Sequence, residues 1–195
     1  MEELKILNIQ NVSMSYGQEP LLTNLTQSFD SKNCYVIHGV SGVGKTTLAK
    51  IISGHLQPSS GQVLLNNKSV INTPGNHCLL VQQSNDLFPW IKTEKNLNQN
   101  NKDNVKILEA LRINHLSNKY PYQLSGGEQK RLSIARAFSY STDIIIIDEA
   151  LSSVDSRQRG EIISSLNHLR KDNIVIFISH YPEDFKAIDA TFIEM

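Results

Sequence analysis

The sequence predicts an α/β fold with a mainly parallel sheet core. Two apolar runs, at 144–147 and 174–178, lack the alternation of a half-exposed strand, which indicates strands buried on both faces of a parallel sheet. Between them, residues 156–169 carry apolar side chains at helical spacing, so the three segments form a parallel crossover unit. A glycine-rich loop at 39–47 lies between a short apolar strand and a helix. Because such sheets bind ligands at the carboxyl ends of their strands, polar residues at those ends indicate the function.

The remaining elements follow from the same apolar patterns, taken in chain order. Strands are predicted within 4–16 (one or two), at 25–29, 34–37, 62–65 and 77–82. Helices are predicted at 46–52, at 105–116 and from Ser125 through Phe138. The segment 96–104 contains five asparagines and is predicted to be an exposed connector. We therefore expect one domain, 1–195, with a core formed by 1–83 and 141–195 and a mainly helical insertion from 84 to about 140.

Composition argues against several classes of protein. Lys plus Arg and Asp plus Glu each number 19, so the net charge is zero and no nucleic-acid partner is expected. No apolar run reaches the roughly 20 residues of a membrane-spanning helix, and the acidic start Met1-Glu2-Glu3 lacks a signal-peptide core. Cys34 and Cys78 lie in apolar runs, which favours buried thiols over a disulfide. These features predict a cytoplasmic protein.

The glycine-rich loop fits the phosphate-binding pattern G-x-x-x-x-G-K-[ST], with the sequence Gly39-Val40-Ser41-Gly42-Val43-Gly44-Lys45-Thr46-Thr47. Glycines lack a Cβ atom, so consecutive backbone N–H groups can converge on phosphates, and the following helix directs its positive end to the same place. Lys45 is expected to bind the terminal phosphates, and the Thr46 hydroxyl is the expected magnesium ligand. A chance glycine turn is the alternative, and the flanking strand and helix argue against it.

Three polar residues follow the two buried strands. Asp148 and Glu149 come directly after the first strand, and adjacent strand residues face opposite ways, so the two carboxylates should have different roles. Asp148 is expected to hold magnesium, and Glu149 to orient or deprotonate an attacking water. His180 follows the second strand and is expected near them, with a ring N–H reaching the terminal phosphate. The alternatives are a turn or helix cap for the carboxylates and a structural role for the histidine.

A second glycine pair lies about 80 residues after the first loop, in Leu124-Ser125-Gly126-Gly127-Glu128-Gln129. Ser125 is a good helix N-cap, and two glycines at a helix N-terminus can form another anion site. An ordinary capped helix start is the alternative. Spacing alone does not explain why one chain should have two anion-binding loops.

Taken together and in this order, these segments resemble the Walker A, signature, Walker B and switch-histidine motifs of the ATP-binding subunits of ABC transporters. The resemblance covers essentially the whole chain, and the six-residue signature is its most discriminating part. It implies a P-loop NTPase fold: a mainly parallel core with an N-terminal antiparallel β subdomain and a short helical subdomain that carries the signature. It also implies ATP and Mg²⁺ as cofactors.

The resemblance implies a mechanism for the second loop. Two such domains pair head to tail, either as a homodimer or with a different ATPase subunit, and each ATP lies between one chain's Walker A and the other's signature. Ser125, Gly126 and Gly127 would then contact ATP bound to the partner. Asp155, in the D-loop-like segment 152–155, would reach across the dimer. Tyr16 stands where the family has an aromatic residue that stacks on adenine, with core packing as the alternative.

The resemblance also implies a membrane partner. Gln83, six residues before Pro89, matches the family's Q-loop glutamine and would contact magnesium and the water and sense transmembrane permease subunits. The cluster Leu87-Phe88-Pro89-Trp90 would line the groove for the permease, or else pack inside the domain. The expected function is hydrolysis of ATP at the cytoplasmic face of the membrane to drive a separate permease. A soluble ABC-type ATPase without a membrane partner is the alternative, and a small P-loop kinase would leave the signature unexplained.

Overall fold

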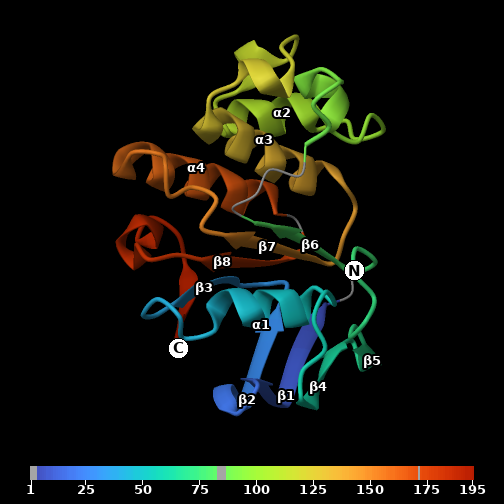
Figure 1. Ribbon diagram of the computed structural model, residues 1–195. Coiled ribbons are helices and arrows are strands. Elements are labelled where there is room, and N and C mark those ends of the chain that lie inside the picture. Colours follow the sequence, from blue (N-terminus) through green and yellow to red (C-terminus); the bar gives the residue numbers. More distant parts are fainter. Residues whose placement is uncertain (1–3, 83–86, 171) are drawn as a thin grey trace.

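The protein contains two β-sheets and a layer of helices, and the computed structural model describes residues 4–82, 87–170 and 172–195. Figure 1 shows the arrangement: α1 (Lys45–Ile52) lies between an antiparallel sheet and a parallel sheet, and the other helices cover the opposite face of the parallel sheet. Two apolar clusters follow from this layering. One joins α1 to both sheets, and the other joins the parallel sheet to the helical layer.

The antiparallel sheet has the order β2-β1-β4-β5. Its strands are β1 (Ile6–Tyr16), β2 (Glu19–Asp30), β4 (Ser60–Leu65) and β5 (Lys68–Ser69). The segment 4–16 thus contains one strand, and β2 begins six residues before the predicted 25–29. The early part of β2 is mostly exposed and its two leucines, Leu21 and Leu22, are adjacent, so apolar alternation does not reveal it. The two-residue β5 was not predicted, because it is too short to carry a pattern.

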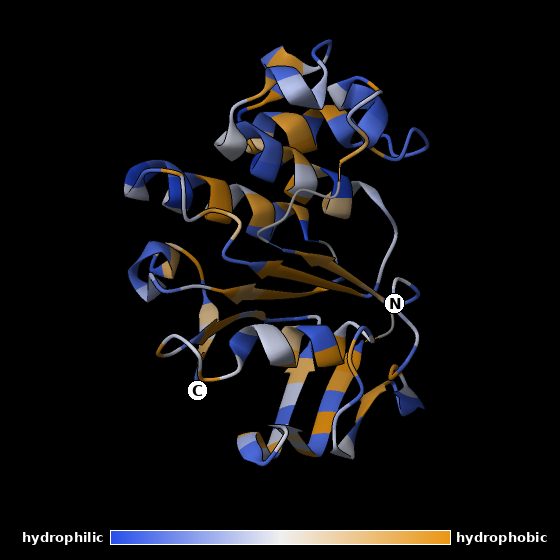
Figure 2. Cartoon of the chain, in the orientation of Figure 1, coloured by the Kyte–Doolittle hydropathy of each residue, from blue (hydrophilic) through white to orange (hydrophobic). Residues whose placement is uncertain are grey.

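The parallel sheet has the order β6-β7-β8-β3-β9. Its strands are β3 (Cys34–His38), β6 (Cys78–Val81), β7 (Ile144–Asp148), β8 (Ile174–Ile178) and β9 (Ala190–Glu194). Every residue of β7 and of β8 is buried, as their continuous apolar runs predict. The edge strand β9 was not predicted, because it is only partly buried. Figure 2 shows the contrast between the continuously hydrophobic central strands and the two-sided helices.

The two cysteines are free thiols buried in strands β3 and β6, as predicted. Burial raises the pKa of the Cys34 thiol to about 12 and also raises the pKa of Cys78. Both side chains are therefore thiols rather than thiolates at neutral pH, and they serve as small apolar core residues.

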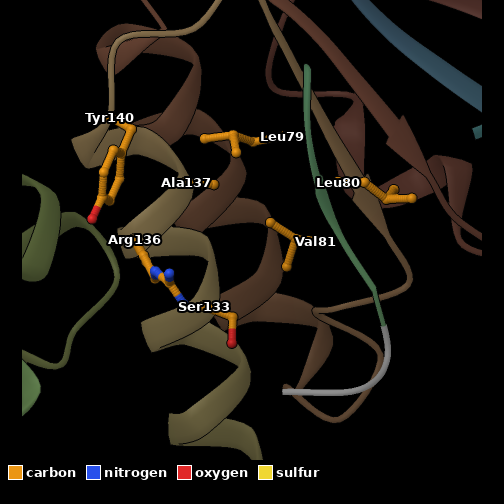
Figure 3. A pocket seen from close by; sticks show the side chains of 7 residues that line it. All are labelled: Leu79, Leu80, Val81, Ser133, Arg136, Ala137 and Tyr140. Atoms are coloured by element: carbon orange, nitrogen blue, oxygen red, sulfur yellow. The ribbon is translucent and has the colours of Figure 1, made fainter. Parts of the chain in front are cut away.

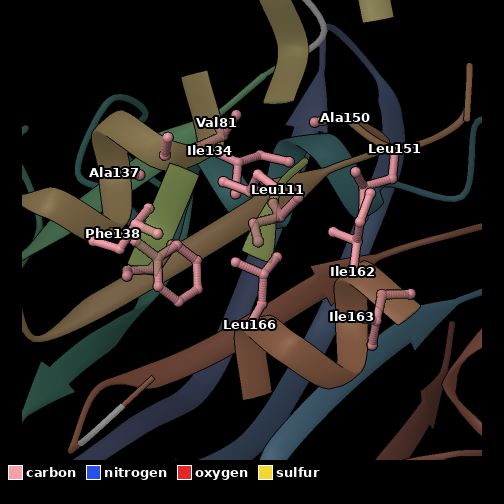
Figure 4. Packing of buried hydrophobic residues seen from close by; sticks show 14 of the residues in the cluster. Val81, Leu111, Ile134, Ala137, Phe138, Ala150, Leu151, Ile162, Ile163 and Leu166 are labelled. Carbon is pink, nitrogen blue, oxygen red and sulfur yellow. The ribbon is translucent and has the colours of Figure 1, made fainter. Parts of the chain in front are cut away.

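The helical layer comprises α2 (Asn104–Ala110), α3 (Gly126–Ser139) and α4 (Ser156–Leu169), together with single 3₁₀ turns. These turns are Thr93–Asn96, Asn114–Leu116, Pro121–Gln123 and Pro182–Phe185. The predicted helix at 105–116 is wrong in its extent, since α2 ends at Ala110 and Arg112 has a positive φ of 57°. Figure 4 shows how Leu111, directly after α2, packs with Phe138 of α3 and Leu166 of α4. No helix within the described residues is long and apolar enough to cross a membrane.

The asparagine-rich segment is not an exposed connector throughout, because its first residue lies in the protein interior. Asn96 is only 1 % exposed. Its Oδ1 accepts from the Phe88 N–H (2.8 Å), and its Nδ2 is within 3.2–3.3 Å of the carbonyls of Phe88, Ile91 and Lys92. Further along, the Asn101 Nδ2 donates to the Ser139 carbonyl at the end of α3 (2.9 Å). These side-chain amides bond to backbone groups that regular secondary structure would otherwise pair. The composition of the segment does not reveal such contacts.

Replacing Asn96 with alanine should destabilise the protein, because it removes the amide that pairs with the Phe88 N–H and with the Ile91 carbonyl in the protein interior. We expect the free energy of unfolding to fall by about 2 kcal/mol or more, measured by urea denaturation. Asn100→Ala is the matched control, since Asn100 is an exposed asparagine of the same segment, and its effect should stay within about 0.5 kcal/mol. Equal effects of the two changes would show that the Asn96 amide has no special structural role.

Candidate functional site

The glycine-rich loop joins the carboxyl end of β3 to the first turn of α1. Gly39, Gly42 and Gly44 have φ values of 148°, 83° and 108°, a region that residues with a side chain rarely adopt. Space is limiting as well: a Cβ on Gly39 would lie 2.3 Å from the Met195 carbonyl oxygen, and one on Gly44 would lie 2.8 Å from Leu22 Cδ2. The loop therefore needs glycine at these positions to keep its shape.

The charged residue of the loop is held at its centre. The Lys45 ammonium donates to the carbonyl oxygens of Gly39 and Val40, each at 2.9 Å, and the residue is 5 % exposed. Next to it, the Thr46 hydroxyl donates to Asp148 Oδ2 at 2.8 Å. Asp148 is the last residue of β7, so this hydrogen bond connects the loop to the neighbouring strand end.

The Asp148 carboxylate is buried and only half satisfied. The residue is 6 % exposed, and within the described part of the chain its Oδ1 has no hydrogen-bond partner. Burial raises the pKa of this carboxyl, although the Thr46 hydrogen bond and the Lys45 charge oppose the shift. A buried carboxylate oxygen without a partner is costly, so it is a feature to be explained by function.

Glu149 and His180 meet at the ends of the two central strands. The His180 Nε2 lies 2.8 Å from Glu149 Oε1, as expected for residues that follow adjacent parallel strands. Glu149 adopts the left-handed region with φ 52°, an uncommon conformation for a residue with a side chain. The backbone turns at this residue, and its N–H still donates to the Ile178 carbonyl of β8 at 3.1 Å. This strained turn holds the carboxylate against the imidazole.

The loop and the strand ends enclose one pocket of about 190 Å³. It is lined by Leu21, Ser41, Gly42, Gly44, Lys45, Thr46, Thr47, Glu149 and His180. Eight of these nine residues were predicted from the sequence, whereas the predicted residues Gly39 and Asp148 do not line the pocket. Leu21 was not predicted, because it comes from β2 and nothing in the local pattern links it to the loop. The volume is below the 300–1,000 Å³ of typical small-molecule sites, so the pocket suits a phosphate tail rather than a whole nucleotide.

The second glycine loop does not line this pocket. Ser125 is the N-cap of α3, where its Oγ accepts from the Glu128 N–H (3.4 Å) while both the Ser125 N–H and hydroxyl donate to Glu128 Oε2 (2.7 Å each). These hydrogen bonds from Ser125 lower the pKa of Glu128. A Cβ on Gly126 would meet no atom within 4 Å, whereas one on Gly127 would lie 3.4 Å from Ser153 Oγ. The loop thus presents an open, capped helix N-terminus, and it adjoins the segment that precedes Asp155.

The remaining predicted site residues have varied positions. Asp155 caps α4, where its Oδ1 accepts from the Gln158 N–H at 3.1 Å. Tyr16 lies at the end of β1 and is 56 % exposed, so the core-packing alternative is wrong for it, but it does not line the pocket. Gln83 lies outside the residues that the structure describes.

The aromatic cluster near Gln83 is largely at the surface. Leu87 packs against the core, whereas Trp90 is 71 % exposed and Phe88 is partly exposed. The Phe88 ring contacts the Arg136 guanidinium, with 4.3 Å from Cζ to the ring centre. Arg136 also borders a groove of about 240 Å³ between β6 and α3 (Figure 3). The groove is lined mainly by apolar residues: Leu79, Leu80, Val81, Ser133, Arg136, Ala137 and Tyr140. Packing inside the domain therefore accounts for Leu87 but not for Trp90.

The chain is similar in sequence to ATP-binding proteins of import systems. The chain is 33 % identical to the spermidine/putrescine import ATP-binding protein PotA of Legionella pneumophila (strain Paris), over 92 % of this chain and 53 % of that protein. It is 28 % identical to the Fe(3+) ions import ATP-binding protein FbpC of Brucella melitensis, over 97 % of this chain and 58 % of that protein. The chain thus spans a little over half the length of these relatives.

A solved structure confirms the predicted fold class. The ADP conformation of MJ1267, an ATP-binding cassette of an ABC transporter, matches with a TM-score of 0.84 at 22 % identity, over 98 % of this chain and 87 % of the other. The fold is therefore that of an ABC-type P-loop NTPase. The family profile described as ABC transporter matches residues 22–152, which include the phosphate loop, the second glycine loop and the Asp148-Glu149 pair. The chain belongs to the ABC transporter family.

Proposed function

We propose that this chain is an ATP-hydrolysing subunit that pairs head to tail with a second ATPase subunit and energises a separate membrane permease. The observation that carries the proposal is the division of the anion-binding groups. Lys45, Glu149 and His180 line one pocket, while the Ser125-Gly126-Gly127 loop does not line it. A second copy that supplies this loop to the pocket explains why each chain has two phosphate-binding elements. Membership of the ABC transporter family supports this arrangement.

Phosphate binding follows from the loop geometry. Converging N–H groups and the N-terminus of α1 stabilise negative charge, and Lys45 adds a full positive charge at the loop centre. Releasing the ammonium from the carbonyls of Gly39 and Val40 would let it reach the terminal phosphates. The pocket holds the phosphate tail, and Tyr16, exposed at the end of β1, is the proposed contact for the adenine.

The residues beside the loop fit a magnesium ion. Hard divalent cations prefer oxygen ligands, and here the Thr46 hydroxyl and the unpartnered Asp148 Oδ1 offer two from adjacent elements. Gln83 is the third proposed ligand. When bound, Mg²⁺ would neutralise charge on the phosphates during their transfer. Asp148 is then buried and incompletely paired because its partner in the working protein is a cation.

Hydrolysis itself needs a positioned water and a stabilised phosphate. His180 Nε2 lies 2.8 Å from Glu149 Oε1, so the two side chains lie together at the edge of the pocket. We assign Glu149 to orient the attacking water and accept its proton, and His180 to donate its ring N–H to the terminal phosphate. Asp155 is the proposed contact across the dimer.

The groove between β6 and α3, with the exposed Trp90 beside it, is the proposed contact for the permease. Its lining is mainly apolar, and exposed apolar surface of this kind marks protein interaction sites. Both curated relatives described above are import ATP-binding proteins, which supports import as the direction of transport. Their printed solutes, polyamines and ferric ions, differ chemically, so the proposal extends to import of a small solute.

Asp148→Asn should stabilise the nucleotide-free protein at neutral pH, because it removes a buried, half-paired charge. The folded-state pKa of Asp148 is raised, so the carboxyl loses its proton at a lower pH in the unfolded chain than in the folded protein. Between these two pKa values, the free energy of unfolding of the wild type therefore falls as the pH rises. The gain in melting temperature should therefore be largest at pH 7 and shrink toward pH 4. The exposed residue Asp189→Asn is the control. A lower melting temperature for Asp148→Asn at pH 7 would contradict this account.

Complementation between two inactive variants tests the shared site. Lys45→Ala disables the loop of its own chain, and Gly126→Asp places a carboxylate where the partner's phosphate should bind, in space that is open within the monomer. Each variant alone should lose nearly all ATP hydrolysis. In a mixed dimer one pocket carries both defects and the other carries neither, so mixing should restore about a quarter of wild-type turnover if half of the dimers are mixed.

The matched control for that experiment is a mixture of Lys45→Ala with Glu149→Gln. Both residues belong to the same half of the pocket, so each mixed dimer has one defect in every pocket and turnover should not return. Recovery in the first mixture alone supports the head-to-tail arrangement. Recovery in neither mixture, or in both, would contradict it.

Trp90→Glu should prevent capture of a membrane partner, because it places a charge on the proposed docking surface. We expect the tagged wild-type chain to retain a multi-spanning membrane protein from detergent-solubilised membranes, identified by mass spectrometry. Phe192→Glu is the control, since this partly exposed aromatic residue lies on β9 at the opposite edge of the sheet. Failure of the wild-type chain to retain any membrane protein would favour a soluble ABC-type ATPase.

A further inference from the structure

Arg159, in the first turn of α4, connects two segments of the site. Its Nη1 donates to the Val154 carbonyl at 2.7 Å, in the segment that carries Asp155. Its Nε donates to Asp184 Oδ2 at 2.5 Å, in the turn that follows His180. The side chain is only 11 % exposed, so both contacts are made away from bulk water. A guanidinium can make such contacts at once because its donors are fixed in one plane.

The partners of Arg159 are themselves held in place. Asp184 is buried, and its second oxygen, Oδ1, accepts from the Ser156 hydroxyl at 3.0 Å, so the first turn of α4 satisfies both carboxylate oxygens. The guanidinium also covers one face of the Tyr181 ring, with 4.3 Å from Cζ to the ring centre. Tyr181 follows His180 directly in the chain. Arg159 therefore contacts the residue next to His180 and the turn that follows it.

A small cavity lies behind the Glu149–His180 pair. Its volume is about 30 Å³, and its lining includes Glu149, Arg159, His180, Tyr181 and Asp184. A space of this size leaves the imidazole some freedom to shift unless its supporting residues hold it. On this side, Arg159 and the residues that it contacts provide that support.

We propose that Arg159 positions His180 and couples its orientation to the position of the 152–155 segment. The inference rests on the proposed function, in which Asp155 contacts the second subunit and His180 contacts the terminal phosphate. Displacement of the Val154 carbonyl on dimer formation would reach His180 through Arg159 and Tyr181. Arg159 does not line the phosphate pocket, so it acts through His180 and not on the substrate.

The direct test observes the His180 imidazole by NMR in protein with labelled histidines. The chain has six histidines, and His180→Gln identifies the His180 signal. Arg159→Met should shift that signal and leave the other five in place, which also reports correct folding. Arg157→Met is the matched control: it lies two residues earlier on α4, its side chain is 91 % exposed, and it should leave the His180 signal unchanged. If Arg159→Met does not fold, Tyr181→Leu replaces it, with Tyr181→Phe as its control.

Kinetics provide a second readout of the same coupling. Arg159→Met should lower kcat for ATP hydrolysis by about tenfold and leave KM within about twofold, since a small misplacement of a catalytic group affects turnover more than binding. In a His180→Ala background the same change should lower kcat by less than about twofold, because the residue through which Arg159 acts is absent.

The outcomes separate this inference from the proposed function. An unchanged His180 signal, or equal losses of kcat in both backgrounds, would overturn the positioning role of Arg159. A wild-type protein without ATP turnover would instead contradict the proposed function, and the NMR signal would still decide whether Arg159 positions His180.

Discussion

The hydrogen bond between the Thr46 hydroxyl and the buried Asp148 carboxylate is the contact on which the rest of the site depends. It joins residues 102 positions apart, at the start of α1 and at the end of β7. It is possible because α1 follows β3, β8 lies beside β3 and β7 lies beside β8 in one parallel sheet, so the carboxyl ends of these strands share an edge. Without that shared edge, the phosphate loop and the acidic pair would be unrelated motifs.

Two carboxylates near the site are buried, and only one of them is fully paired. Asp184 and Asp148 are both buried carboxylates, but Asp184 has partners on both oxygens, whereas Asp148 Oδ1 has none within the described residues. The first arrangement stabilises a turn, since a buried charge is tolerated when it is paired. In the second arrangement, Asp148 Oδ1 is the oxygen that the proposed Mg²⁺ would bind.

Side-chain hydrogen bonds, as well as helices, stabilise the mainly helical segment 87–140. Asn96 and Asn101 supply hydrogen bonds to backbone groups between short elements, and Ser139 accepts one from the Asn98 N–H at 2.9 Å. This scaffold presents Ser125 at the start of α3, where Ser125 and Gly126 are exposed and Gly127 is partly exposed. Ser125 and Gly126 are therefore accessible to the proposed second subunit.

The sequence by itself predicted the phosphate loop, the central strands, the helix cap at Ser125 and the proximity of Glu149 to His180. Each of these depends on local patterns, on glycine chemistry or on the rule that parallel strands end together. Only the tertiary structure decided the contacts between distant segments: Leu21 in the pocket, Asn96 in the interior, the edge strand β9, and the link from Arg159 to Val154, Asp184 and Tyr181. These depend on which surfaces meet after folding, and neither spacing nor periodicity along the chain carries that information.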